Sequence, residues 1–406
     1  MQQTLICYEH DRLLVCENSA FTREHLDMLE KWLDCQKKEK GSVPFFQPVY
    51  KGIKFSSWVG MLQVGDLSIE ILPKVSRTAA DDPVRWKSLL LRMLARTKNI
   101  PLYETDLQLQ TLSRQPLSDI FLTAYIRELD ALIRKGLLKA YRKEAKNRRT
   151  LKGKLDFSRN IKYNAFHQEL FYTNATVYDY QSLFNRILIQ ALRCIRTVPC
   201  VKTDAKRILD TWGGLTPVAP DAVYWQKPMF DRRTDGYRKA MLYAKMILTG
   251  YNPSLRQGSL PVISFLFDMN RLFEAYVFQT LRRTGRFEKI MAQSGGKFWR
   301  NMILRPDILA EYNGQEYVLD TKWKRLDQYS DVAENDLRQI FAYCHKFSCD
   351  KGYLVYPLFD GCPSDLQAQP YKVPAADDVS ARKASCGIKF FDLFSTDPLG
   401  CIDWNM

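Results

Sequence analysis

Apolar and polar positions follow different periods along the chain, and the two-residue period of β-strands dominates its first part. Within residues 1–75, the segment 58–75 alternates apolar and polar side chains around Gly65 and Asp66, which predicts a β-hairpin. One helix is expected to begin near Thr22, because leucines and a tryptophan then recur on one side of the segment. The first part is therefore predicted to be β-rich.

The middle of the chain has the three-to-four-residue period of helices. This period over residues 116–146 predicts a helix that runs into a basic tract, followed by a short strand-like segment at 151–157. Two more helices are expected near 181–196 and 236–249. Residues 251–261 then collect Pro, Gly and Ser between periodic segments, which is typical of a linker.

The last part of the chain alternates helices and strands, as α/β domains do. The expected elements are a helix at 268–284, strands near 287–292 and 298–304, a hairpin over 305–324, a helix at 333–347 and a strand at 352–357. The patterns together predict three domains. Residues 1–80 form a β-rich N-terminal domain, 81–255 a mainly helical middle region, and 256–406 an α/β domain with a central mixed sheet.

The hairpin of the last domain places two aspartates together. Asn313 and Gly314 favour a two-residue type I′ turn, which requires positive φ at both central positions. With this turn, Asp307 and Asp320 are paired across the two strands, with Cβ atoms about 5 Å apart on one face. Lys322 lies two residues beyond Asp320 and shares that face.

Two facing carboxylates destabilise an antiparallel pair unless a cation lies between them. Oxygen ligands at this separation suit Mg²⁺ or Mn²⁺, and Lys322 could hold a metal-activated water and offset phosphate charge. The alternative is an exposed hairpin with scattered charges, as the acidic pair Glu311 and Glu316 near the tip illustrates. Asp307 and Asp320 lie far from the tip among apolar residues, which favours a metal-dependent phosphodiesterase site.

Two flanking helices offer further candidates. Glu274, in the helix before the strands, is a possible additional ligand or water-holding group. Gln339 and Tyr343 are one helical turn apart in the helix after the hairpin, so they share a face. A helix with an ordinary polar edge explains that pair equally well. The chain has 4 histidines, and they form no cluster in the sequence.

Charge adds a polyanion to the candidate partners. The chain carries 60 Lys and Arg against 45 Asp and Glu, a net charge of +15, which attracts nucleic acid, an anionic membrane or an acidic protein. The densest basic tract consists of Arg142, Lys143, Lys146, Arg148, Arg149, Lys152 and Lys154. A solvated face, a DNA contact and a contact with an acidic partner surface all remain open for this tract.

The cysteines and the N-terminus point to a cytoplasmic protein. The chain has 10 cysteines but no C-x-x-C pair, which argues against a zinc site or a disulfide framework and favours reduced, mostly buried thiols. Five cysteines from Cys344 onward are spaced too loosely to favour an iron–sulfur cluster. No signal peptide and no membrane-spanning run is evident.

Several short motifs resemble those of one known family. They are Pro306-Asp307, Asp320-Thr321-Lys322, Gln339-x-x-x-Tyr343, IEILPKV at 69–75 and LKGKLDFSRNI at 151–161. The first three resemble the RecB-like branch of the PD-(D/E)xK nuclease superfamily. With the last two, the chain resembles the McrC family, the nuclease subunits of McrBC-type modification-dependent restriction systems. The resemblance extends over most of the chain, although only these short motifs carry it.

The resemblance implies a restriction-endonuclease-like C-terminal domain that cuts double-stranded DNA. Asp307, Asp320 and the Thr321 carbonyl would bind Mg²⁺, Lys322 would position the water, and Glu274, Gln339 and Tyr343 would have supporting catalytic roles. The N-terminal part would dock on a hexameric McrB-like AAA+ GTPase, stimulate its GTP hydrolysis and receive modified DNA from it. A motor of this chain's own is not expected, since Gly-Gly-Lys at 295–297 is followed by Phe and no nucleotide-binding loop is present.

Two other functions fit the sequence less well. A stand-alone RecB-like nuclease would need only the last third of the chain. A non-catalytic, DNA-binding activator of a GTPase would not need an intact set of Asp307, Asp320 and Lys322.

Overall fold

The fold comes from a computed structural model that describes residues 3–40, 45–73, 82–97, 111–218, 230–250, 262–300, 302–359, 362–371, 384–395 and 402. These residues divide into two compact units. The first unit combines residues 3–117 with 266–406, and the second consists of residues 118–265. The linker expected at 251–261 lies outside the described residues, and the three-domain division stays a prediction.

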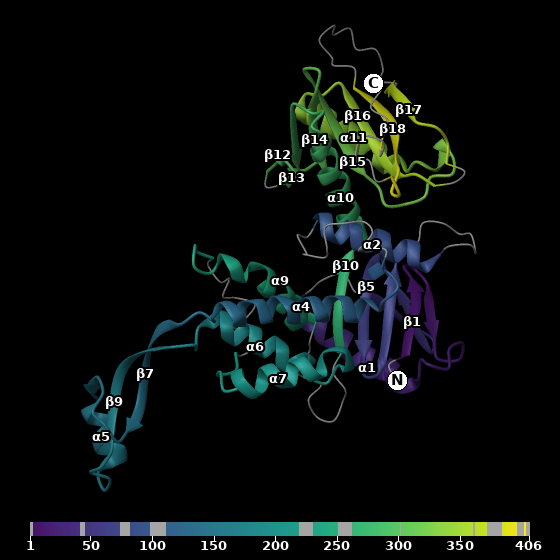
Figure 1. Cartoon of the computed structure of the whole chain (residues 1–406). Coiled ribbons are helices and arrows are strands. Elements are labelled where there is room, and N and C mark those ends of the chain that lie inside the picture. Colours follow the sequence, from purple (N-terminus) through teal and green to yellow (C-terminus); the bar gives the residue numbers. More distant parts are fainter. Residues whose placement is uncertain are drawn as a thin grey trace. The chain divides into compact units, whose positions relative to one another are not determined.

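The N-terminal part of the first unit is β-rich, as expected (Figure 1). Its elements are β1 (Gln3–Tyr8), β2 (Arg12–Leu14), α1 (Arg23–Lys40), β3 (Phe46–Val49), β4 (Gly52–Phe55), β5 (Trp58–Val64) and β6 (Leu67–Leu72). β1 pairs in parallel with β6, and β5 and β6 form the expected hairpin, with Gly65 at a φ of 62°. β2, β3 and β4 form an antiparallel sheet. α1 begins directly after Thr22 and buries Leu29, Trp32 and Leu33.

The C-terminal part of the first unit is built on a mixed six-stranded sheet of order β11-β14-β15-β16-β18-β17. The helices are α2 (Pro83–Thr97), α10 (Met269–Thr284) and α11 (Glu334–Phe347), with a 3-10 turn η4 (Tyr329–Asp331). The strands of this sheet are β11 (Lys289–Ala292), β14 (Ile308–Tyr312), β15 (Gln315–Thr321), β16 (Lys351–Pro357), β17 (Leu366–Pro370) and β18 (Ser385–Phe391). β12 (Gly296–Trp299) and β13 (Met302–Leu304) form a separate two-stranded sheet, and β10 (Val262–Asp268) lies beside β5 in the N-terminal sheet of order β1-β6-β5-β10. α11 packs on β15 and β16, and α2 packs on α10.

Most of these elements were predicted from the sequence, but the prediction of one strand was wrong. The single strand expected near 298–304 is two short strands, β12 and β13, which pair antiparallel to each other. Arg300, at the turn between them, has a φ of 48°, a left-handed conformation that ends a strand. β17 and β18 were not anticipated. They complete the sheet beyond β16.

The second unit combines a group of helices with an arm, the segment 140–179 (Figure 1). The helices are α4 (Leu117–Lys135), α6 (Leu183–Ile195), α7 (Lys202–Trp212) and α9 (Arg238–Gly250), with 3-10 turns η1 (Pro199–Val201) and η2 (Asp235–Tyr237). The arm consists of β7 (Ala140–Arg148), β8 (Lys154–Leu155), α5 (Phe157–Asn164) and β9 (Phe171–Asp179). In the arm, β9 pairs antiparallel with both β7 and β8.

The expectation that the helix of 116–146 runs into the basic tract is wrong. The helix ends at Lys135, and Gly136 follows with a φ of 91°, a backbone angle that residues with a side chain rarely adopt. From Ala140 the chain is a strand, with Tyr141 exposed and Glu144 half-buried. The many charges of this strand hide its two-residue period, because the side chains of both faces are polar.

Candidate active site

The hairpin of β14 and β15 has the register expected from its turn. Asn313 and Gly314 have φ values of 51° and 69°, as a type I′ turn requires. The paired residues run from Tyr312 opposite Gln315 to Ile308 opposite Leu319. The next position along this register is Asp307 opposite Asp320. The turn therefore fixes which acidic residues meet at the far end of the hairpin.

Asp307 is hydrogen-bonded to Thr321, the last residue of β15. The Asp307 carboxylate accepts hydrogen bonds from the Thr321 backbone N–H and from its hydroxyl, both at 2.7 Å to Oδ2. Thr321, whose carbonyl is an expected ligand, is thereby fixed beside Asp307.

Asp320 is a nearly buried carboxylate, with 2% of its surface exposed. Burial and the neighbouring charge of Asp307 raise the pKa of Asp320 to about 6, although the Lys322 ammonium acts in the opposite direction. Lys322 Nζ lies 2.6 Å from Asp320 Oδ2. The negative charge at this site is therefore only partly offset by the protein itself.

Lys322 lies between the sheet and α11. Besides Asp320, its Nζ contacts Asp336 Oδ1 at 3.3 Å and donates to Gln339 Oε1 at 3.0 Å. Burial opposes the charged form of Lys322, but Asp320 and Asp336 outweigh it and raise the pKa of this lysine. Lys322 is thus held as an ammonium in one position.

The Gln339–Tyr343 pair predicted from helical spacing forms part of this network. Gln339 Nε2 donates to the Tyr343 hydroxyl at 2.7 Å, and that hydroxyl donates to the Arg305 carbonyl at 3.0 Å. The Arg305 carbonyl lies just before Asp307 in the chain. The pair therefore ties the Lys322 side chain to the segment that carries Asp307, which an ordinary polar helix edge would not do.

Glu274 of α10 lies near the same carboxylates. Its Oε1 accepts from Gln293 Nε2 at 2.8 Å, and the Gln293 backbone N–H donates to the Asp307 carbonyl at 2.8 Å. Burial, Asp307 and Asp320 together raise the pKa of Glu274 to about 7. The structure thus brings together all six side chains that the sequence selected for this site.

Two contributors were missed. Asp336 is buried, bonds Lys324 Nζ at 2.6 Å and also contacts Lys322. Burial acts to raise its pKa, but the two lysines outweigh burial and lower it. Asp336 precedes Gln339 by three residues, so the shared helical face could have revealed it. Gln293 comes from the end of β11, and its sequence surroundings carry no comparable signal.

The donor set suits a hard divalent cation. No group of three or more His, Cys, Asp or Glu side chains in the described ranges is already gathered closely enough to hold a metal ion. Glu274 and Asp320 nevertheless have raised pKa values partly because Asp307 repels them, and a cation would remove this conflict. Carboxylate and carbonyl oxygens are the ligands that Mg²⁺ and Mn²⁺ prefer. The residues present therefore fit the expected metal.

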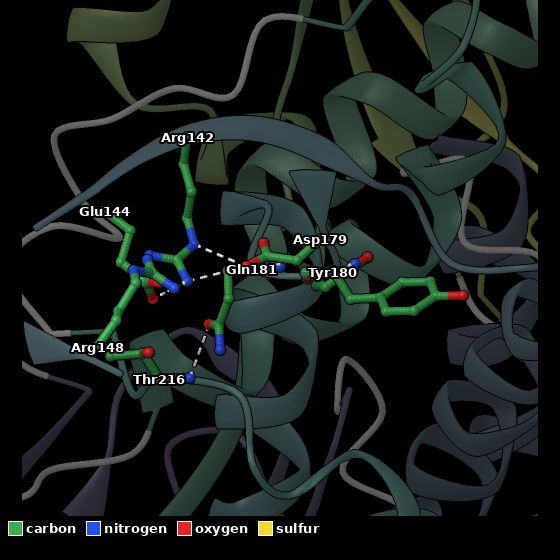
Figure 2. Close-up of polar contacts among 8 residues, drawn as sticks. Arg142, Glu144, Arg148, Asp179, Tyr180, Gln181 and Thr216 are labelled. Carbon is green, nitrogen blue, oxygen red and sulfur yellow. Dashed lines mark hydrogen bonds and ion pairs between the residues drawn. The ribbon is translucent and has the colours of Figure 1, made fainter. Parts of the chain in front are cut away.

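The basic tract lies on the arm, and two of its seven members are held in ion pairs (Figure 2). Arg142 bonds Asp179 through Nε at 2.9 Å and Glu144 through Nη2 at 2.7 Å. Arg148 bonds the other oxygen of Glu144. The remaining members are exposed, namely Lys143, Lys146, Arg149, Lys152 and Lys154. The exposed five, not Arg142 and Arg148, are therefore available for a polyanion.

The arm also exposes an unusual number of large apolar side chains. Those most open to solvent are Tyr141, Leu151, Phe157, Ile161, Tyr163, Phe166 and Tyr178. Phe166 is 96% exposed and Tyr141 75%. Scattered exposed apolar residues are normal, but a gathering on one projecting segment is typical of an interaction surface.

The other sequence expectations concern thiols and membranes. None of the eight cysteines whose side chains the structure describes forms a disulfide, and Cys344, Cys349 and Cys386 are buried. Burial raises the pKa of Cys386 to about 11, so this thiol stays protonated. Among the described helices, none combines the length and the hydropathy needed to cross a bilayer.

Comparisons with known proteins add a family and a fold. A family model described as "McrBC 5-methylcytosine restriction system component" matches residues 53–357. No curated protein is similar enough in sequence to count as a match. A chain of a solved Thermococcus gammatolerans assembly of McrB AAA+ hexamers with bound McrC has the same fold, with a TM-score of 0.66 and 20% identity. That match covers 99% of this chain and 97% of the other. A chain of the Thermococcus gammatolerans McrBC complex aligns with a TM-score of 0.49 and 21% identity, over 71% and 89% of the two chains.

Proposed function

Because the chain belongs to the family of McrBC 5-methylcytosine restriction system components, we propose that it is the DNA-cleaving subunit of such a system. The observation that carries this proposal is the position of Lys322. Its ammonium is fixed by Asp320, Asp336 and Gln339, and the charge of Asp320 in turn acts on Asp307 and Glu274. Carboxylates and one lysine at the end of a hairpin suit the hydrolysis of a phosphodiester.

In this proposal Asp307, Asp320 and the Thr321 carbonyl hold Mg²⁺, or Mn²⁺ in its place. A bound divalent ion there would supply a Lewis acid for the phosphate and an acidified water. Lys322 orients the attacking water and offsets the charge that develops on the phosphate oxygens. Gln339, itself bonded to Tyr343, orients the Lys322 ammonium. Glu274 can take up a proton at Oε2 near neutral pH.

The proposed partner is a McrB-like AAA+ GTPase hexamer that delivers modified DNA. The solved Thermococcus gammatolerans assembly, whose chain shares this fold, contains McrC bound to McrB hexamers. The arm supports a contact of this kind, since it projects five exposed cations and several exposed aromatic rings. We propose that this arm, with the N-terminal part, engages the partner or guides DNA and that binding stimulates GTP hydrolysis in a cytoplasmic complex.

The test is plasmid cleavage by the full chain with Mg²⁺ and GTP, with and without a McrB-like GTPase from the same source. Asp320→Ala and Lys322→Ala should each abolish cleavage and leave GTPase stimulation intact. Glu316→Ala is the matched control, because Glu316 is an exposed acid near the tip of the same hairpin. Cleavage at the normal rate by Asp320→Ala would exclude this site.

The same assay separates the alternatives. Cleavage that does not depend on the GTPase would identify a stand-alone nuclease. GTPase stimulation without any cleavage would identify a non-catalytic activator. Chelation with EDTA should stop cleavage, and Mg²⁺ or Mn²⁺ should restore it.

A further inference from the structure

The residue after Lys322 is bound by a residue far away in the sequence. Trp323 Nε1 donates a hydrogen bond to Glu9 Oε1 at 2.7 Å, across 314 positions of the chain. Both residues belong to the first compact unit. Glu9 has only 2% of its surface exposed, so its carboxylate has little access to water. A hydrogen bond to a buried side chain contributes to stability, and its loss removes one partner of a group that water does not reach.

Glu9 is presented to Trp323 by a tight turn at the end of β1. Its backbone N–H donates to the Leu72 carbonyl at 3.0 Å, which continues the pairing of β1 with β6. The next residue, His10, has a φ of 65°, and Asp11 N–H closes the turn on the Tyr8 carbonyl at 3.2 Å. The Glu9 backbone is therefore fixed by the N-terminal sheet and its turn.

Trp323 is held on its ring face as well as at its N–H. Its ring lies 5.2 Å from that of Phe273 at an interplanar angle of 57°. Phe273 is fully buried and directly precedes Glu274 in α10. Trp323 directly follows Lys322 in the chain, and its packing partner Phe273 directly precedes Glu274. The indole is therefore linked to two of the proposed catalytic residues.

The backbone around Trp323 has little freedom to absorb a rotation of this ring. The Lys322 N–H donates to the Val355 carbonyl at 2.9 Å, and the Lys324 N–H donates back to the Lys322 carbonyl at 2.9 Å. A displaced Trp323 ring would therefore strain these two bonds and, through them, the placement of Lys322. Lys322 Nζ would then leave the positions from which it reaches Asp320 and Gln339.

We propose that Glu9 is a positioning residue of the cleavage site, acting through Trp323 to hold Lys322 where it meets Asp320 and Gln339. This inference rests on the proposed nuclease function. It assigns the N-terminal strand end to the support of the reaction, in addition to any docking role. Supporting contacts of this kind commonly change activity by about 10- to 100-fold when removed.

The experiment compares four variants of the full chain, each with the GTPase, GTP and saturating Mg²⁺. Trp323→Phe keeps the ring against Phe273 but loses the N–H, and Glu9→Ala loses the acceptor. Glu9→Gln keeps an acceptor oxygen and is the rescue variant. Trp86→Phe is the control, since Trp86 is a buried tryptophan of the same unit that packs on Phe359 and Phe394.

Trp323→Phe and Glu9→Ala should lower the single-turnover cleavage rate about 10- to 100-fold, with an unchanged DNA concentration for half-maximal rate. Glu9→Gln should stay within about threefold of the wild type, and Trp86→Phe should cleave normally even if its melting temperature falls. Wild-type rates in Trp323→Phe and Glu9→Ala would overturn the proposal. An equal loss in Trp86→Phe would also overturn it, because the effect would then be general destabilisation.

A second readout keeps this inference separate from the proposed function. Hydrogen exchange at the Lys322 amide, which bonds Val355, should speed up in Trp323→Phe and Glu9→Ala but not in Trp86→Phe. If the wild type cuts no DNA, the proposed nuclease function is wrong. If the Lys322 amide exchanges at the same rate in the wild type and in all variants, the proposed role of Glu9 in holding Lys322 is wrong, whatever the result for cleavage.

Discussion

The buried ion pair of Glu70 and Lys87 should make removal of the lysine alone more harmful than removal of both charges. Glu70, on β6, has no exposed surface, and Lys87 Nζ of α2 lies 2.5 Å from its Oε2. The other carboxylate oxygen accepts the backbone N–H of Leu117, the first residue of α4, at 2.6 Å. Lys87 also donates to the Gln115 carbonyl at 3.1 Å.

The structure sets the expected magnitudes. Lys87→Met leaves a fully buried carboxylate without its cation, which should lower the free energy of unfolding by about 3–5 kcal/mol. That loss reduces the folding equilibrium constant by roughly two to four orders of magnitude. In the double variant Glu70→Met with Lys87→Met neither charge of this pair remains, and the main loss is the partner of Leu117 N–H, about 1–3 kcal/mol. The double variant should therefore be more stable than Lys87→Met.

Urea denaturation followed by tryptophan fluorescence measures this order. Lys31→Met is the control, because Lys31 is an exposed lysine on α1 of the same unit and its loss should cost less than about 0.5 kcal/mol. A double variant that is less stable than Lys87→Met, or a Lys87→Met variant as stable as the control, would refute the reasoning.

Three further predictions concern the site and the arm. The pKa of Glu274 is raised to about 7 and that of Asp320 to about 6, so protons compete with the metal ion for these carboxylates below neutral pH. The Mg²⁺ concentration for half-maximal cleavage should therefore rise as the pH falls from 8 to 5.5. A titration that shows no such rise would contradict this prediction. Asp336→Asn should slow cleavage about tenfold at saturating Mg²⁺ by loosening Lys322, whereas an unaltered single-turnover rate would remove Asp336 from the site. Arg149→Glu should weaken DNA binding or partner stimulation without lowering the melting temperature, and a DNA defect should reduce the salt slope by about 1; unchanged binding and stimulation would exclude a role for this exposed residue.

The sequence predicted the hairpin of the site because that information is local. A type I′ turn at Asn313 and Gly314 fixes which residues pair, so Asp307 and Asp320 could be placed without knowledge of the rest of the fold. The Gln339–Tyr343 pair was equally accessible, since helical spacing alone puts both on one face. The contact of Gln339 with Lys322 could not be foreseen, because it depends on how α11 packs on β15.

What escaped prediction depends on contacts between distant parts of the chain. The bond between Glu9 and Trp323 joins two segments that share no pattern, and nothing near Glu9 marks it as buried. The strand β7 was mistaken for the end of a helix for a different reason. Its pairing with β9 determines its conformation, while its own residues, such as Lys143 and Glu144, are compatible with either structure.

The division of the chain has a consequence for its synthesis. The first unit consists of residues 3–117 and 266–406, so the entire second unit is made before the later half of the first exists. The nascent N-terminal sheet therefore leaves the ribosome with the Glu9 carboxylate still lacking Trp323. Contacts between such distant segments close late and slowly. Premature termination within residues 266–406 should thus release a chain whose second unit is complete but whose N-terminal sheet is exposed to aggregation and proteolysis.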